Sequence, residues 1–96
     1  MPTFVTLVRD TPESWKTVKD MPQRWDGLQK DVEKAGGKIV QCYATMGRFD
    51  FVLITEFKEA RSAHKVLVQT AKRGTVLLET MPAAPMDEFL GVVKEL

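Results

Sequence analysis

The spacing of apolar residues follows two different periods along the chain. Four short segments rich in β-branched and aromatic side chains predict β-strands at residues 3–9, 38–46, 50–57 and 75–81. Residues 11–35 and 59–73 carry apolar side chains three and four positions apart, which predicts two helices. A short final helix is also predicted, with one apolar side formed by Met86, Phe89, Leu90, Val93 and Leu96.

Glycine, proline and threonine mark where these elements begin and end. Thr11-Pro12 is typical of a helix start, because threonine caps free amides and a first-turn proline loses no hydrogen bond. Pro22 interrupts the first helical segment and is expected to kink or restart it. Gly36-Gly37 and Gly74 are expected to end the two main helices.

Two turns are predicted between the strands and around the last of them. Residues 47–49 are expected to join the second and third strands as a hairpin. Pro82 and Pro85 are expected to bound a turn before the final helix. The order strand, helix, strand, strand, helix, strand, helix is typical of a ferredoxin-like α+β fold, with both main helices on one face of an antiparallel sheet. No linker or repeat divides the chain, so residues 1–96 are expected to form one domain.

Both faces of the predicted sheet are apolar. On the first strand, Phe4 and Val8 alternate with Val5 and Leu7, and the third and fourth strands repeat this pattern. Two helices cover only one face, and a monomer rarely leaves a whole sheet face of apolar side chains in water. We therefore expect two copies to pair sheet against sheet as a dimeric α+β barrel, unless the chain's own C-terminal helix closes that face.

Composition and charge limit the classes of partner and location. The 96 residues are 44% hydrophobic and 28% charged, with a net charge of +1 that gives no strong attraction to nucleic acid or to an anionic membrane. No apolar run approaches the roughly 20 residues that cross a bilayer. The first ten residues lack the basic and apolar regions of a secretory signal, and a single cysteine suits a reducing compartment. A cytoplasmic location is therefore expected.

The second strand, the hairpin and the third strand resemble the GYD domain family, which is named for a Gly-x-Tyr-Asp hairpin. The segment Tyr43-Ala-Thr-Met-Gly-Arg-Phe-Asp-Phe-Val-Leu-Ile carries the likeness, with Phe49 at the position where tyrosine is usual. Other segments are similar to the family, and together they extend over nearly the whole chain: Pro2–Val8, Lys19–Pro22, Gly36–Lys38 and Glu79-Thr80. Met21 stands where a capping serine is common. The resemblance implies a ferredoxin-like fold and an oligomer, but it implies no specific activity.

Four residues are candidates for holding a small molecule between the sheet and the helices or at the mouth of the barrel. Arg48 and Asp50 lie in the predicted hairpin, Tyr43 lies near it, and His64 lies at the edge of the second helix's apolar stripe. Each also has a structural interpretation. Asp50 can accept backbone amides of a tight turn, Tyr43 can pack in an interface, and His64 can pack against the core.

The leading hypothesis is a homo-oligomeric binding or assembly module, and the alternative is a small cofactor-independent enzyme of the oxygenase, isomerase or lyase type. The alternative assigns acid–base roles to His64, Tyr43 and Glu56, because Glu56 shares a strand face with apolar residues that would raise its pKa if enclosed. No cofactor motif is found. No metal site is predicted either, since Cys42 and His64 lack the paired spacing that metal ligands show.

Overall fold

The computed structural model describes residues 1–96 and confirms each predicted helix and strand. In chain order its elements are β1 (Thr3–Asp10), α1 (Pro12–Lys16), the 3₁₀ turn η1 (Val18–Asp20), α2 (Met21–Lys34), β2 (Lys38–Ala44), β3 (Phe51–Glu56), α3 (Ala60–Ala71), β4 (Val76–Ala83) and α4 (Met86–Lys94).

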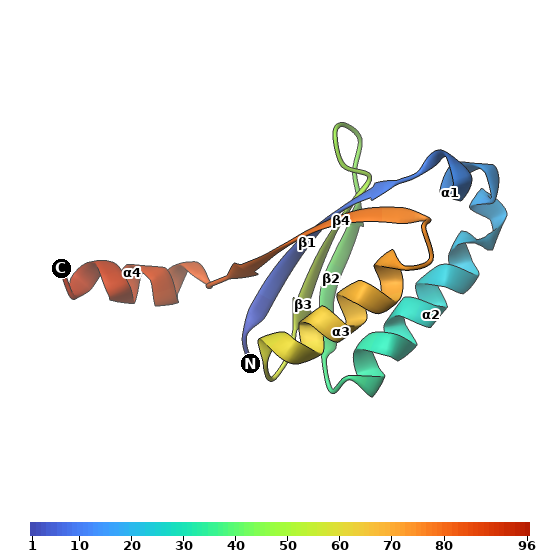
Figure 1. Cartoon of the computed structure of the whole chain (residues 1–96). Helices are drawn as coiled ribbons and strands as arrows, with labels where there is room; N and C mark the ends of the chain where they lie inside the picture. The colour runs from blue at the N-terminus through green and yellow to red at the C-terminus, as the bar shows by residue number, and fades with distance from the viewer.

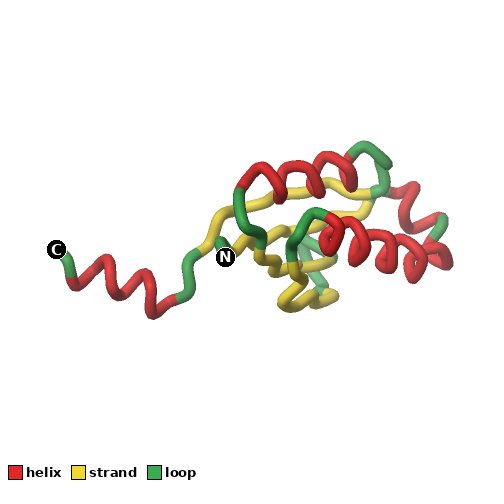
Figure 2. Tube along the Cα trace, turned by 90° about the horizontal axis from the view of Figure 1, so that it is seen from below, coloured by secondary structure: helices red, strands yellow, loops and turns green.

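The four strands form one antiparallel sheet in the order β2-β3-β1-β4. The helices α2 and α3 lie on the same side of this sheet, and α4 stands away from it (Figures 1 and 2). This order and layering are those of the ferredoxin-like α+β fold, as predicted. The additional C-terminal helix is also confirmed.

The first helical segment divides into two helices for reasons that are visible in its sequence. The Thr11 hydroxyl accepts the backbone N–H of Ser14 at 3.3 Å and so caps α1. The chain then passes through η1 and restarts at α2, with Pro22 in the first turn. Proline is tolerated there because a first-turn N–H has no helical acceptor. The expected interruption at Pro22 is therefore a restart.

The apolar core lies between the sheet and the two long helices. Its buried apolar residues are all at most 9% exposed: Phe4, Val8, Val32, Leu53, Phe57, Ala63 and Val66. The rings of Phe4 and Phe57 meet edge to face, with centroids 6.1 Å apart. This core is small for a chain of 96 residues. Many of the other large apolar side chains remain exposed in the single chain.

Two details of the predicted strands are wrong. The register of β2 shifts between Ile39 and Gln41, so Ile39 points to the helices while Gln41 and Tyr43 point away from them. Strict alternation places Ile39 and Tyr43 on one face, and a bulge reverses that assignment. Pro82 does not begin a turn, since it lies within β4 and pairs with Phe4. An edge strand such as β4 tolerates proline because one of its sides has no ladder to complete.

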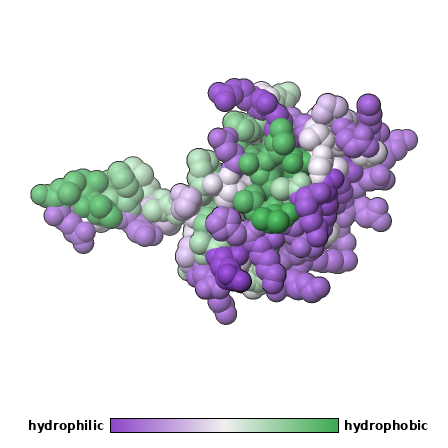
Figure 3. All heavy atoms as spheres, viewed as in Figure 1, coloured by the Kyte–Doolittle hydropathy of each residue, from purple (hydrophilic) through white to green (hydrophobic).

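The helix α4 projects from the body of the molecule (Figure 1). All of its residues are exposed, including Phe89 at 52% and Leu90 at 45%. The radius of gyration is 14.6 Å, whereas a compact chain of this length has about 12.5 Å. The helix therefore does not close the sheet of its own chain. Figure 3 shows its surface as mostly apolar, together with a second apolar area on the body.

Candidate functional site

The sheet face turned away from α2 and α3 carries no covering element. We call this surface the open sheet face. Val5 pairs with Ile54 on one side and Met81 on the other, and Leu7 pairs with Val52. The edge positions are strongly exposed, with Leu77 at 60%. The apolar residues of the open sheet face are Val5, Leu7, Tyr43, Val52, Ile54, Leu77 and Met81.

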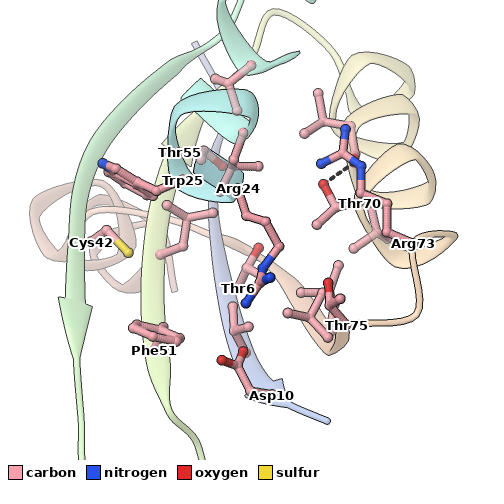
Figure 4. Close-up of a pocket in the computed structure, with 18 of the residues that line it drawn as sticks. Thr6, Asp10, Arg24, Trp25, Cys42, Phe51, Thr55, Thr70, Arg73 and Thr75 are labelled. Carbon is pink, nitrogen blue, oxygen red and sulfur yellow. Dashed lines mark hydrogen bonds between the residues drawn. The ribbon is translucent and has the colours of Figure 1, made fainter. Parts of the chain in front are cut away.

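A helix–sheet cleft lies on the opposite face, where α2 and α3 diverge over the strands (Figure 4). Its volume is about 720 Å³, which falls within the roughly 300–1,000 Å³ of small-molecule sites. Trp25 of α2 and Val66 of α3 line it, and Val8 and Phe51 line it from the strands. Most of the lining is apolar, so the few polar groups in it determine which chemistry the cleft can bind.

The polar end of the cleft is built around Asp10, the last residue of β1. Its Oδ2 accepts the Ser14 hydroxyl at 3.0 Å, and its backbone N–H donates to Oδ2 of Asp50 at 2.8 Å. Arg24 reaches down from α2 toward this end (Figure 4) and donates to the Ser14 hydroxyl oxygen at 3.1 Å. Arg24 also donates to the carbonyl of Thr17 at 3.3 Å. These bonds join β1, α1, the Thr17 junction after it, α2 and the hairpin at one point.

The environment of Asp10 makes its ionised form less favourable than it is in water. Burial raises the pKa of Asp10 above its ordinary value, and the nearby negative charge of Asp50 raises it further. The Ser14 hydrogen bond and the charge of Arg24 lower the pKa and offset part of this shift. A buried carboxyl group with one bonded oxygen and a raised pKa is a feature of functional sites as well as of structural networks.

Further polar groups lie along the floor of the cleft. The hydroxyls of Thr6 and Thr80 are 3.0 Å apart and join β1 to β4. Thr55 on β3 is only 3% exposed and pairs with Phe4 of β1. All of the buried polar residues of the chain line this one cleft: Thr6, Asp10, Ser14 and Thr55. Cys42 also lines it, and burial raises the pKa of its thiol, which keeps it protonated at neutral pH.

The predicted hairpin residues have mainly structural contacts. Gly47 has a φ of +138°, a conformation that favours glycine. Asp50 accepts a backbone amide, but the amide is that of Asp10 on β1 and not one of the hairpin turn. Arg48 is exposed, its carbonyl accepts from Nε of Arg9 at 3.0 Å, and its guanidinium lies 5.7 Å from the Phe49 ring centre.

The structure does not bring the other candidates together. Tyr43 pairs with Val52, and Glu56 pairs with Lys38. Both Tyr43 and Glu56 lie on the open sheet face, on the other side of the sheet from the cleft. His64 is exposed on α3 and does not line the cleft. The three acid–base candidates are therefore dispersed. Among the four proposed ligand-binding residues, Asp50 alone contacts the polar end of the cleft.

Sequence reasoning missed the polar end of the cleft. Asp10 follows Phe4, Thr6 and Val8 in strict alternation and therefore points to the helices, a signal that was available in the sequence. Ser14 and Arg24 have no comparable signal, because their meeting depends on the break between α1 and α2.

None of the helices combines the length and the apolar character that crossing a bilayer requires. Nowhere do three or more histidine, cysteine, aspartate or glutamate side chains gather in a way that would hold a metal ion.

The sequence of the chain shows which protein family it belongs to. The sequence model of the GYD domain matches residues 4–93. The chain belongs to the GYD domain family. A relative of this GYD protein in Thermus thermophilus is named "Glutamine synthetase and cystathionine beta-lyase binding protein". It is 30% identical over 95 residues, which are 98% of this chain and 100% of the relative.

Solved structures share the fold of this GYD protein at low sequence identity. A crystal structure of a Thermus thermophilus protein has a TM-score of 0.56 at 20% identity and covers 88% of this chain and 95% of its own. The 5-chloro-2-hydroxyhydroquinone dehydrochlorinase of Burkholderia phenoliruptrix AC1100 has a TM-score of 0.63 at 16% identity and covers 85% of this chain and 93% of its own. At these identities the likeness shows the fold and assigns no activity.

Proposed function

We propose that this GYD protein is a homo-oligomeric protein-binding module whose copies pair through their open sheet faces. The observation that carries the proposal is the row of apolar residues across all four strands that no element of the chain covers. Val5, Leu7, Val52 and Ile54 occupy its two central strands. Burying such a surface against a second copy removes it from water without any further segment.

The size of the open sheet face is an argument for including α4 in the proposed interface. Four strands about 4.8 Å apart and about seven residues long, at 3.3 Å per residue, give a face of roughly 19 by 23 Å, or about 440 Å². A stable interface buries about 800 Å² on each partner. The projecting α4, with Phe89, Leu90 and Val93 each at least 45% exposed, supplies further apolar area. We place α4 against the second copy.

The protein-binding part of the proposal is supported by the full-length likeness to the Thermus relative, which is named for two enzymes that it binds. A paired module presents every outer surface twice, so it suits a partner that is itself a symmetric assembly. The alternative of a small enzyme has less support, since its three acid–base candidates do not lie together.

A pair of aspartate substitutions tests the pairing. Leu7→Asp places a charge in the centre of the open sheet face, and Val68→Asp makes a similar change on α3, where Val68 is 61% exposed. We expect Leu7→Asp to sediment as a monomer and Val68→Asp to sediment like the wild type. Circular dichroism checks that both variants remain folded. A folded Leu7→Asp variant with the sedimentation coefficient of the wild type would contradict the proposal.

The binding function is tested by mixing the protein with glutamine synthetase and cystathionine beta-lyase from its own source. We expect at least one enzyme to co-elute with the wild type in size-exclusion chromatography. Leu7→Asp is expected to bind more weakly, because a monomer loses the gain from two attached copies. A wild-type protein that co-elutes with neither enzyme would contradict the protein-binding assignment.

A further inference from the structure

We propose that the Asp10 end of the helix–sheet cleft binds a small organic cation, namely a primary amine carried on an apolar or aromatic body. This site is separate from the open sheet face and lies on the other side of the sheet. The inference goes beyond the proposed function and does not depend on it. It rests on an unpaired oxygen, on the balance of charge around it and on the shape of the apolar lining.

The first observation is that Asp10 keeps one oxygen free. The residue is 8% exposed, and its Oδ2 accepts the Ser14 hydroxyl. The only other hydrogen bond between Asp10 and a side chain is the one that its backbone N–H donates to Asp50. No fully buried side-chain oxygen or nitrogen in the protein lacks a hydrogen-bond partner. Oδ1 of Asp10 accepts no bond from the chain and so is not fully buried, which leaves a free acceptor on a residue that lines the cleft.

The second observation is an excess of negative charge at this end. The charges that act on the Asp10 carboxyl are one carboxylate, that of Asp50, and one guanidinium, that of Arg24. Both terminal nitrogens of Arg24 already donate to Ser14 and Thr17. Arg73, which also lines the cleft, is paired with Asp31 at 3.0 Å. An ammonium group restores the balance, because it brings a positive charge and three donors to a site with a free acceptor.

The third observation is the apolar lining next to Asp10. Val8 lies two residues before Asp10 on the same face of β1, about 7 Å away along the strand. Phe51 and Leu78 pair with Val8 in the neighbouring strands, and Trp25 lines the cleft from α2. An amine separated from a ring by one or two carbons therefore places its nitrogen at Asp10 and its ring over Val8 and Phe51.

Three near-isosteric probes that differ in charge test the inference: 2-phenylethylamine, 2-phenylethanol and phenylacetate. Trp15→Phe leaves Trp25 as the only tryptophan, so its fluorescence reports on the cleft. We expect the amine to bind about tenfold or more tightly than the alcohol, as a charge-assisted bond to a carboxylate does. The carboxylate is expected to bind most weakly. Equal affinities for amine and alcohol, tightest binding of phenylacetate, or no response to any probe at millimolar concentration would each overturn the inference.

A matched pair of substitutions locates the site. Asp10→Asn keeps an oxygen for Ser14 and removes the charge, so the advantage of the amine over the alcohol should disappear. Asp26→Asn makes the same change on the exposed side of α2, where Asp26 pairs with Lys30 at 3.1 Å, and should leave all affinities unchanged. An Asp10→Asn variant that keeps the full amine preference would refute the assignment to Asp10. Should Asp10→Asn not fold, the comparison of the three probes on the Trp15→Phe protein still decides the question.

Discussion

Gly37 provides a sharp test of the packing around the core, because a single methyl group there has no space. A Cβ atom at this position would lie 2.4 Å from Cε1 and 2.5 Å from Cδ1 of Phe57, and 2.9 Å from the carbonyl oxygen of Glu56. Carbon atoms in contact are ordinarily about 3.5–4.0 Å apart. Phe57 is 3% exposed and packs edge-on against Phe4, so its ring has nowhere to move without disturbing the core.

The size of the effect follows from two opposing terms. Overpacking a core costs about 1–3 kcal/mol. Replacing glycine by alanine also stiffens the unfolded chain, which offsets about 0.4–1 kcal/mol of that cost. We therefore expect Gly37→Ala to destabilise the fold by about 1–2 kcal/mol. At about 4–8 °C per kcal/mol for a domain of this size, the Tm should fall by roughly 4–16 °C.

The same substitution at Gly27 is the matched control. Gly27 lies inside α2, and a Cβ atom there would meet nothing within 4 Å. Alanine is favoured over glycine in a helix by about 0.8–1.0 kcal/mol, so Gly27→Ala should raise the Tm by several degrees. Calorimetry of both variants measures the two shifts. If Gly37→Ala melts at or above the wild-type temperature, the close approach to Phe57 is wrong.

Two further predictions concern Asp10 and α4. Because the pKa of Asp10 is raised in the folded protein, its protonated form stabilises the fold. This stabilisation is fully present below pH 3.8, the ordinary pKa, and is lost as the pH rises through the folded-state pKa. The Tm difference between Asp10→Asn and the wild type should therefore become more positive from pH 3.5 to pH 7, and a constant difference would argue against this environment. Phe89→Asp on α4 should leave circular dichroism unchanged but raise the dissociation constant of the pair by about tenfold or more. An unchanged constant would remove α4 from the interface.

Much of the fold is predictable from local sequence. Alternation placed Phe4 and Val8 opposite Val5 and Leu7, and the strand register confirms this. Thr11 and Pro22 marked the helix starts through rules that involve only neighbouring backbone groups. The failures are also local. The bulge after Ile39 adds one residue to the alternation, and no single side chain in that segment signals it.

The candidate site depended on information that a sequence pattern does not contain. Asp10 and Arg24 meet only because α1 and α2 turn back toward the end of β1, and the angle of that turn is a tertiary property. His64 lay at the edge of an apolar stripe, where a small rotation of α3 decides between the cleft and solvent. An amphipathic α4 reveals that it has an apolar side but does not reveal what covers that side.

Sedimentation equilibrium of the wild-type protein over a range of concentrations measures the mass of the species in solution. It tests most directly whether a second copy covers the open sheet face. We expect a species of twice the 10.9 kDa chain mass, or a multiple of that pair, at low micromolar concentration. A single species with the mass of one chain at about 100 micromolar and above would show that this apolar surface stays in water, and would contradict the proposed pairing.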